Sequence, residues 1–166
     1  MGEAMEYQVR KAETSDLSEI LAIYEGARAF MRQHGNPNQW GNSTPEPASV
    51  EKNIGDGDLY VLENGQRIHG VFFFKIFADP TYEKIYDGAW KSSEPYGVLH
   101  RVAGDGSGGI LKAAAAFARQ KIQHLRIDTH AENIPMQGAI LKQGFSYCGI
   151  IHTEKGDPRL AYERLK

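Results

Sequence analysis

The residues best suited to chemistry lie in a glycine-rich stretch past the middle of the chain. Residues 98–118 read VLHRVAGDGSGGILKAAAAFA, with glycines at 104, 106, 108 and 109. Glycine lets backbone N–H groups converge without side chains in the way, and the helix that follows adds a partial positive charge. The stretch therefore favours an anion-binding turn, with a flexible connection between strand and helix as the alternative. It is not a Walker loop, because Ile110 and Leu111 follow Gly109 where Lys and Ser or Thr are required.

A second polar stretch follows shortly afterwards. Residues 127–145 read IDTHAENIPMQGAILKQGF. The pattern predicts a strand that ends at Thr129, a polar bend to Asn133, a helix that starts at Pro135 and a stop at Gly144.

Together the two stretches resemble the signature motifs of the GCN5-related N-acetyltransferases, the GNAT family. That family has a strand, a pyrophosphate loop and a helix, then a strand, an Asn, a helix and a closing Gly-Phe, which here is Gly144-Phe145. The resemblance is strong over 96–152, and the order of elements agrees from 7 to 165. It implies a GNAT fold of the α+β class with three α/β layers. Its mixed, mostly antiparallel sheet of about seven strands would splay between the fourth and fifth strands, between about four flanking helices.

The resemblance also implies a co-substrate and a reaction. Acetyl-CoA would place its pantetheine arm between the splayed strands and its diphosphate on backbone N–H groups. The residues implied for this site are Val102, Ala103, Gly104, Asp105, Gly106, Ser107, Gly108, Gly109 and Asn133. The acetyl group would move directly to a bound primary amine of a small molecule or peptide, in a ternary complex.

Three features depart from the family pattern. Counting back three residues from Gly106 reaches Ala103, where the family has Arg or Gln, and the loop is shorter than usual. Ile140 stands where the family commonly has a tyrosine that protonates the departing thiolate. A thiol with a pKa of roughly 8.5 is a fair leaving group even so, and water can protonate it. The missing tyrosine keeps a second hypothesis open: a GNAT-like module that binds acyl-CoA without robust catalysis.

Amine attack requires a base or a polar water channel. An alkyl ammonium with a pKa near roughly 10 is mostly charged at neutral pH and has no lone pair. His100 is the first candidate, because it lies on a predicted strand and histidine titrates in the useful range. Asp128 and His130, at the end of the next predicted strand, are the other candidates. The alternatives are a histidine hydrogen-bonded within the sheet, and turn and helix-cap polarity for the other two.

Two segments are expected to form the acceptor pocket. One is the loop 34–47, and the other is the polar and aromatic insert 81–95, whose carboxylates would attract a cationic amine. The side chains expected to bind the acceptor are His34, Asn36, Gln39, Trp40, Tyr82 and Trp90. The alternative is a solvated loop with one buried anchor tryptophan.

The elements that must position these residues follow from periodicity and turn signals. A hairpin over 59–77 has a type I′ turn at Asn64-Gly65, and its apolar second strand is expected inside the sheet. This hairpin disfavours a third hypothesis, a nucleotide-binding protein, which would need a βαβ unit there. The other strands are expected at 7–11, 96–103, 125–129, 145–152 and 159–165, and helices at 17–34, 48–54, 110–120 and 135–143.

Composition and charge narrow the class of protein. The 166 residues, 41% of them hydrophobic, predict a single domain over 1–166, with residues 1–4 as an extension before a second start at Met5. A net charge of -2 without charged blocks argues against nucleic acid. Without a membrane span or signal segment, and with Cys148 as the one cysteine, the chain is expected to be cytoplasmic and free of disulfides and metal. The expected partner is a small-molecule or peptide amine; a homodimer stays open.

Overall fold

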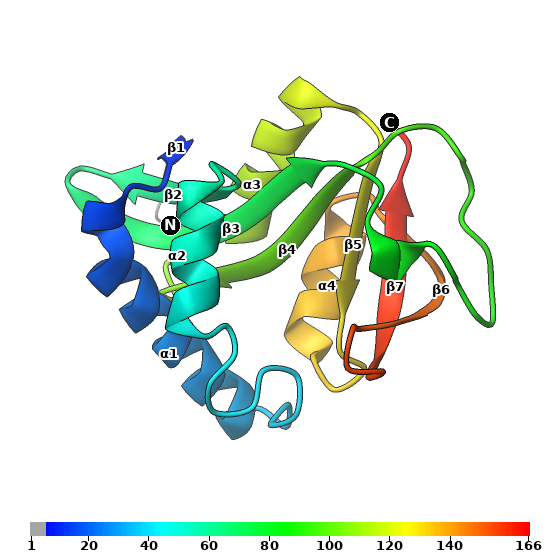
Figure 1. The fold of residues 1–166 in the computed structure, drawn as a ribbon, viewed down its shortest axis with the longest axis horizontal. Helices are drawn as coiled ribbons and strands as arrows, with labels where there is room; N and C mark the ends of the chain where they lie inside the picture. Colours follow the sequence, from blue (N-terminus) through cyan, green and yellow to red (C-terminus); the bar gives the residue numbers. More distant parts are fainter. Residues whose placement is uncertain (1–5) are drawn as a thin grey trace.

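The computed structural model describes residues 6–166 and builds them around one seven-stranded sheet (Figure 1). The predicted extension at residues 1–4 lies outside the described residues. The strands are β1 (Gln8–Lys11), β2 (Leu59–Asn64), β3 (Arg67–Ile76), β4 (Gly97–Gly104), β5 (Leu125–Thr129), β6 (Ser146–His152) and β7 (Pro158–Arg164). Their order across the sheet is β1-β2-β3-β4-β5-β7-β6, in which only β4 and β5 pair in parallel.

Helices cover both faces of this sheet (Figure 1). They are α1 (Leu17–Gln33), α2 (Pro47–Gly55), α3 (Ile110–Lys121) and α4 (Ile134–Lys142), with short 3-10 turns η1 (Thr14–Asp16) and η2 (Pro80–Tyr82). No helix in the described part of the chain combines the length and apolar character that crossing a membrane would need. The mixed seven-stranded sheet with four helices confirms the predicted GNAT fold class.

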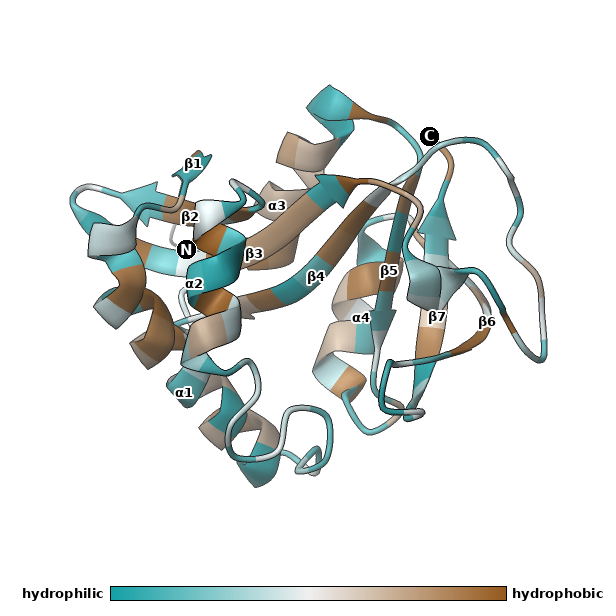
Figure 2. Ribbon diagram, in the orientation of Figure 1, coloured by the Kyte–Doolittle hydropathy of each residue, from teal (hydrophilic) through white to brown (hydrophobic). Residues whose placement is uncertain are grey.

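Two main apolar cores lie on opposite faces of the sheet. Val61 and Val71 of the central strands face α1 and α2, while Leu62, Phe72 and Leu99 face α3 and α4. Figure 2 shows the apolar residues concentrated in β3 and β4, with the connecting loops mostly polar. A third, smaller core lies under the insert that follows η2, against β4, β6 and β7. The insert therefore covers the far half of the face that carries α1 and α2.

The predicted hairpin between β2 and β3 forms, but its turn lies one residue further on. Asn64 pairs with Arg67, so the central residues of the turn are Gly65 and Gln66. Only Gly65 of these takes a positive φ, at 65°. A positive φ at the first central position alone is the requirement of a type II′ turn, so the type I′ assignment was wrong. Asn64 instead donates a side-chain hydrogen bond to the Glu6 carbonyl at 2.7 Å.

The central feature of the sheet is the early end of the β4–β5 pairing. The parallel register runs from Gly97–Leu125 to Leu99–Ile127 and stops there. Beyond it, β4 continues for five residues to Gly104 and carries a bulge, because Phe72 of β3 faces both Arg101 and Val102. Arg101 takes a φ of 55°, which is uncommon for a residue with a side chain. The two strands therefore diverge where the predicted splay lies.

Two glycines allow α3 to begin close against the sheet. Gly70 and Gly104 are paired across β3 and β4. A Cβ on Gly104 would lie 2.5 Å from Cγ1 of Ile110, and one on Gly70 would lie 2.7 Å from Cδ1 of the same side chain. The first residue of α3 thus fills the space that two missing side chains leave, and this contact fixes the glycine-rich loop between β4 and α3.

Replacing Gly104 by Ala is expected to lower the free energy of unfolding by about 1–3 kcal/mol, the usual cost of overpacking. Urea unfolding measures this, and the cost is expected to be smaller in an Ile110→Ala background, which lacks the Cγ1 atom of the contact. Gly26→Ala is the matched control, because a Cβ at that helical position meets nothing within 4 Å and is expected to stabilise by about 0.5–1 kcal/mol. A Gly104→Ala variant as stable as the wild type would contradict the contact.

Candidate active site

A cleft of about 610 Å³ opens where β4 and β5 diverge. Its walls come from β3, β4 and β5, the start of α4, the loop between α1 and α2, and the β6–β7 turn. Lining side chains that carry functional groups include Gln39, Asp79, His100, Asp128, Thr129 and Arg159. The apolar part of the wall includes Trp40, Phe73 and Phe77. The cleft thus joins aromatic surface to a few converging polar groups, as ligand sites commonly do.

His100 lies between two carboxylates. Its Nε2 is 2.7 Å from Oδ2 of Asp79, and its Nδ1 is 3.4 Å from Oδ1 of Asp128. The ring also lies 5.7 Å from that of Phe73, its partner on β3. Burial lowers the pKa of His100, but the hydrogen bond to Asp79 and the charge of Asp128 outweigh it and raise the pKa above its ordinary value. The imidazole is therefore positioned and electrostatically supported as a proton acceptor.

Asp79 is held by the turn that ends β3. Its Oδ1 accepts hydrogen bonds from the N–H and the hydroxyl of Thr81, at 2.9 and 2.7 Å, at the start of η2. Burial raises the pKa of Asp79, yet the bonds to His100 and Thr81 together lower it below its usual value. Asp79 is therefore a buried, ionised partner of His100, only 6% exposed.

Tyr82 lies directly behind Asp128 and not on the cleft wall. Its hydroxyl donates to Oδ1 of Asp128 at 2.6 Å, and its side chain is 1% exposed. Burial and the neighbouring Asp128 raise the pKa of Tyr82 well above its usual value. The phenol therefore stays neutral and orients the carboxylate that faces His100.

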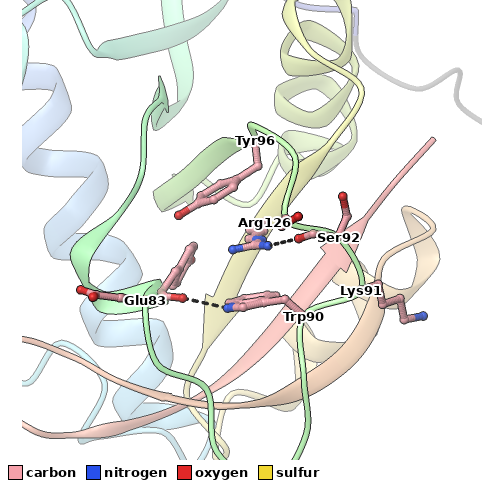
Figure 3. A pocket seen from close by; sticks show the side chains of 8 residues that line it. Glu83, Trp90, Lys91, Ser92, Tyr96 and Arg126 are labelled. Atoms are coloured by element: carbon pink, nitrogen blue, oxygen red, sulfur yellow. Dashed lines mark hydrogen bonds between the residues drawn. The ribbon is translucent and has the colours of Figure 1, made fainter.

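Trp90 lies in a separate, smaller pocket (Figure 3). Its indole N–H donates to the Tyr82 carbonyl at 2.8 Å, and its ring stacks on the guanidinium of Arg126, 4.0 Å from the ring centroid. Tyr96 stacks on the other side of the same guanidinium, also at 4.0 Å. Trp90 thus anchors the insert as a half-buried side chain, and neither Trp90 nor Tyr82 lines the 610 Å³ cleft.

The loop between α1 and α2 reaches the cleft through Gln39 and Trp40. Gln39 Oε1 accepts from the amides of both Asn36 and Asn133, at 2.9 Å each. Asn133 also caps α4, because its Oδ1 accepts from the N–H of Met136 at 3.1 Å. Asn36 is buried behind the wall, while His34 is exposed and stacked on Phe30 outside the cleft.

His130, a predicted candidate base, and Ile140, at the position of the family's tyrosine, also lie away from the cleft wall. His130 Nδ1 accepts from the N–H of Glu132 at 3.0 Å, and burial lowers the pKa of His130. This contact matches the turn polarity considered as its alternative. Ile140 is fully buried in the core beneath α3 and α4, so its position offers no general acid.

The glycine-rich loop presents backbone N–H groups at the end of β4. Gly106, Gly108 and Gly109 all take positive φ, at 94°, 86° and 72°. Their N–H groups have no hydrogen-bond partner among residues 6–166. The N–H of Ser107, in contrast, donates to Oδ1 of Asp105 at 3.0 Å. Of the residues predicted for the co-substrate, Val102 and Asn133 line the cleft itself, and the glycines form the adjoining loop.

Asp105 brings a carboxylate to this loop, and a histidine pairs with it. His69 Nδ1 lies 2.7 Å from Oδ2 of Asp105, and the Ser107 hydroxyl lies 3.1 Å from the same nitrogen. His69 is the extra residue of a bulge in β3, between the pairs Leu62–Gly70 and Glu63–Ile68. The bulge therefore turns His69 toward the loop, a contact that the sequence does not reveal.

The important side chains that sequence reasoning missed are Asp79, Arg159 and the buried pair Arg126–Glu163. Asp79 follows the apolar run of β3 and precedes Pro80, so it reads as a strand end. Arg159 and Glu163 alternate with apolar residues along β7 and read as its solvent face. Within the described residues, no group of three or more His, Cys, Asp or Glu side chains could hold a metal ion.

Several solved structures share the fold of this chain. No protein-family model and no curated protein matches the sequence. A GNAT-family acetyltransferase from Streptococcus agalactiae is 26% identical, with a TM-score of 0.84 over 96% of this chain and 95% of that one. An N-acetyltransferase from Staphylococcus aureus is 20% identical, with a TM-score of 0.62 over 98% and 100%. A ribosomal-protein-alanine N-acetyltransferase from Brucella melitensis is also 20% identical, with a TM-score of 0.62 over 96% and 99%.

These similarities confirm the GNAT resemblance that the two sequence motifs indicate. The chain has the GNAT fold, from β1 to β7, with the sheet divided between β4 and β5.

Proposed function

We propose that this chain is an acyl-CoA-dependent N-acetyltransferase that moves an acetyl group from acetyl-CoA to a primary amine of a small molecule or peptide. The observation that carries the proposal is His100, held between Asp79 and Asp128 on the wall of the cleft that the diverging strands open. The names of the structural neighbours, which are acetyltransferases, support the same reaction.

The polar groups of the cleft fit acetyl-CoA. Thr129 Oγ1, at the end of β5, is buried and has no hydrogen-bond partner among the described residues, yet Thr129 lines the cleft. An amide of a pantetheine arm between β4 and β5 would satisfy this hydroxyl. The unpaired N–H groups of Gly106, Gly108 and Gly109, ahead of α3, suit a diphosphate. When bound, acetyl-CoA would supply an acetyl thioester as the electrophile.

The chain's own residues would prepare the amine. The bond from His100 Nε2 to Asp79 favours the tautomer that carries its proton on Nε2, which leaves Nδ1 free to take a proton from the amine. The imidazolium that forms would be stabilised by Asp128, which Tyr82 holds in place. Because Ile140 offers no acid, water would protonate the released thiolate.

Two assays separate the proposed enzyme from its alternative, a GNAT-like module that binds acyl-CoA without robust catalysis. Acetyl-CoA at about 100 times its dissociation constant is expected to stabilise the chain by roughly 2.7 kcal/mol in thermal unfolding, whereas ATP and NAD are not. Release of free thiol from acetyl-CoA with a panel of primary amines then tests turnover. Binding without thiol release would favour the binding module, and no binding would contradict both.

Thr129→Val is expected to change binding and stability in opposite directions. The substitution keeps the shape but removes the hydroxyl, so acetyl-CoA affinity is expected to fall about threefold to tenfold, the worth of one hydrogen bond. The free energy of unfolding without ligand is expected to rise by up to about 1 kcal/mol, because an unpaired buried hydroxyl is costly. Calorimetric titration and urea unfolding measure the two quantities.

The control for this prediction is Thr14→Val, at an exposed threonine in η1 outside the cleft. It is expected to leave acetyl-CoA affinity unchanged. Unaltered affinity in Thr129→Val would remove this hydroxyl from the co-substrate site.

A further inference from the structure

Arg159 is a buried guanidinium without a carboxylate partner. The residue is 7% exposed, and its hydrogen bonds go to two backbone carbonyls, those of Gln39 and Pro158, both at 3.0 Å. No Asp or Glu oxygen of residues 6–166 lies within 4.0 Å of it. Arg126, the other buried arginine, is in contrast paired with Glu163 at 3.0 Å. A buried cation is costly unless an anion pairs with it, and Arg159 has no such ion pair among these residues.

Arg159 lines the same cleft as His100 and lies on the same face of the sheet as Asp128. Asp128 pairs directly with Ala161, and Arg159 is two residues from Ala161 on β7, so their side chains share a face. The offset along the strand is about 7 Å. Asp128 is already engaged by the Tyr82 hydroxyl and faces His100. The cleft therefore carries Asp79 and Asp128 beside His100, and the cation Arg159 near the β6–β7 turn, where Asp157 also lines the wall.

We infer that the acceptor is an amine that also carries a carboxylate, with its amine at His100 and its carboxylate on Arg159. This inference rests on the proposed function and names its acceptor class. A guanidinium has five N–H donors in a planar fork, of which two are used on the carbonyls. The remaining three suit one carboxylate. Burial lowers the pKa of Arg159 although the charges of Asp128 and Asp157 act to raise it, and a bound carboxylate would offset this cost of burial.

The test compares acceptors that differ only in the carboxylate. Each ω-amino acid, from glycine to 4-aminobutyrate, is paired with the alkylamine that has the same carbon chain but no carboxylate. An aminoalkylphosphonate of equal length shows whether the site prefers a phosphonate to a carboxylate. For at least one length, kcat/KM is expected to be about tenfold to a hundredfold higher with the carboxylate, the worth of a charge-assisted hydrogen bond. Calorimetric titration of the same compounds, with coenzyme A present, measures the preference without turnover.

Variants of Arg159 separate anion binding from its structural bond to Gln39. Arg159→Met is expected to reduce the ratio of kcat/KM for the amino acid to kcat/KM for the alkylamine to about one. Arg159→Lys, which keeps the charge without the planar guanidinium, is expected to keep part of the preference for the amino acid. Arg28→Gln is the matched control, because Arg28 also donates to a carbonyl of the α1–α2 loop, that of Thr44, but lies outside the cleft wall. Its ratio is expected to equal that of the wild type.

The outcomes distinguish this inference from the proposed function. Thiol release with equal preference for both members of every pair would overturn the inference and leave the proposed function standing. A preference for the phosphonate, or a loss of coenzyme A binding in Arg159→Met without a change in the ratio, would overturn it as well. If no amine releases thiol, the proposed function fails, and the calorimetric preference for the carboxylate still decides the inference.

Discussion

His100→Gln is expected to lower kcat/KM for acetyl transfer by about 10²- to 10⁴-fold, the usual contribution of a general base. The reason is the geometry of the cleft wall, where Asp79 fixes the Nε2 side of the ring and Nδ1 is left to take the proton of the amine. Glutamine keeps a polar side chain of similar size but has no group that titrates near neutral pH. Steady-state thiol release over a range of amine concentrations measures the effect.

The pH dependence of the rate is a second test of the role of His100. Since the pKa of His100 is raised, the protonated and inactive form persists to a higher pH than for an ordinary histidine. The rate is therefore expected to rise with pH through this raised value. Asp79→Asn removes the negative charge that strengthens the hydrogen bond to His100 and helps to raise its pKa, so the rising limb is expected to move to lower pH.

The control is His152→Gln, because His152 is exposed on β6 and lies outside the cleft wall. It is expected to keep the wild-type rate and pH profile. A His100→Gln variant with unchanged turnover and an unchanged profile would remove His100 from the proposed mechanism.

Glu163→Leu is expected to lower the free energy of unfolding by about 3–5 kcal/mol, the usual cost of breaking a buried ion pair from one side. Glu163 is 1% exposed, and its carboxylate accepts hydrogen bonds from three nitrogen donors. Its carboxylate accepts from His124 and Arg126 through Oε2, and from the N–H of Lys91 through Oε1 at 2.6 Å. Leucine would leave the guanidinium of Arg126 buried without its anion and would release the insert at Lys91. Urea unfolding at neutral pH measures the loss.

The sign of the pH effect on Glu163 follows from its environment. Burial raises its pKa, but the bonds from His124, Lys91 and Arg126 outweigh burial and hold the pKa below its usual value. Its contribution to stability is therefore complete above the unfolded value of about 4.3 and is lost as pH falls below that value. The difference in stability between wild type and Glu163→Leu is expected to narrow in that range.

Glu51→Gln is the control for the stability measurement, because Glu51 is exposed on α2 and has no ion pair among the described residues. Its effect is expected to stay within about 0.5 kcal/mol. A Glu163→Leu variant that unfolds like this control would show that the buried cluster contributes little.

The order of the elements could be read from the sequence because local signals agree there. The apolar spacing of α1, the alanine-rich start of α3 and the glycines at 35 and 144 all mark elements that the structure contains. Two details of the strands could not be predicted from the local sequence. The hairpin turn lies one residue further on than predicted, and β3 has a bulge at His69. The bulge at Arg101 is held by Tyr24 and Asn53, which bind its carbonyl and guanidinium from α1 and α2.

The polar residues of the site were only partly predictable, because their roles depend on segments far apart in the chain. The strand position of His100 and the strand end at Asp128 pointed to the cleft wall. Asp79 approaches His100 only because the chain turns at η2 after β3, where Thr81 holds the carboxylate. Trp90 and Arg126 are 36 positions apart and meet only when the insert lies over β5, so composition alone could not show that Trp90 lines the smaller pocket.

A crystal structure of the chain with coenzyme A tests the central claim most directly, that the gap between β4 and β5 is the co-substrate site. The account predicts the diphosphate on the N–H groups of Gly106, Gly108 and Gly109, with the thiol beside His100 and β4 and β5 still unpaired beyond Leu99 and Ile127. Coenzyme A bound elsewhere, or the two strands paired past that point with the gap closed, would contradict it.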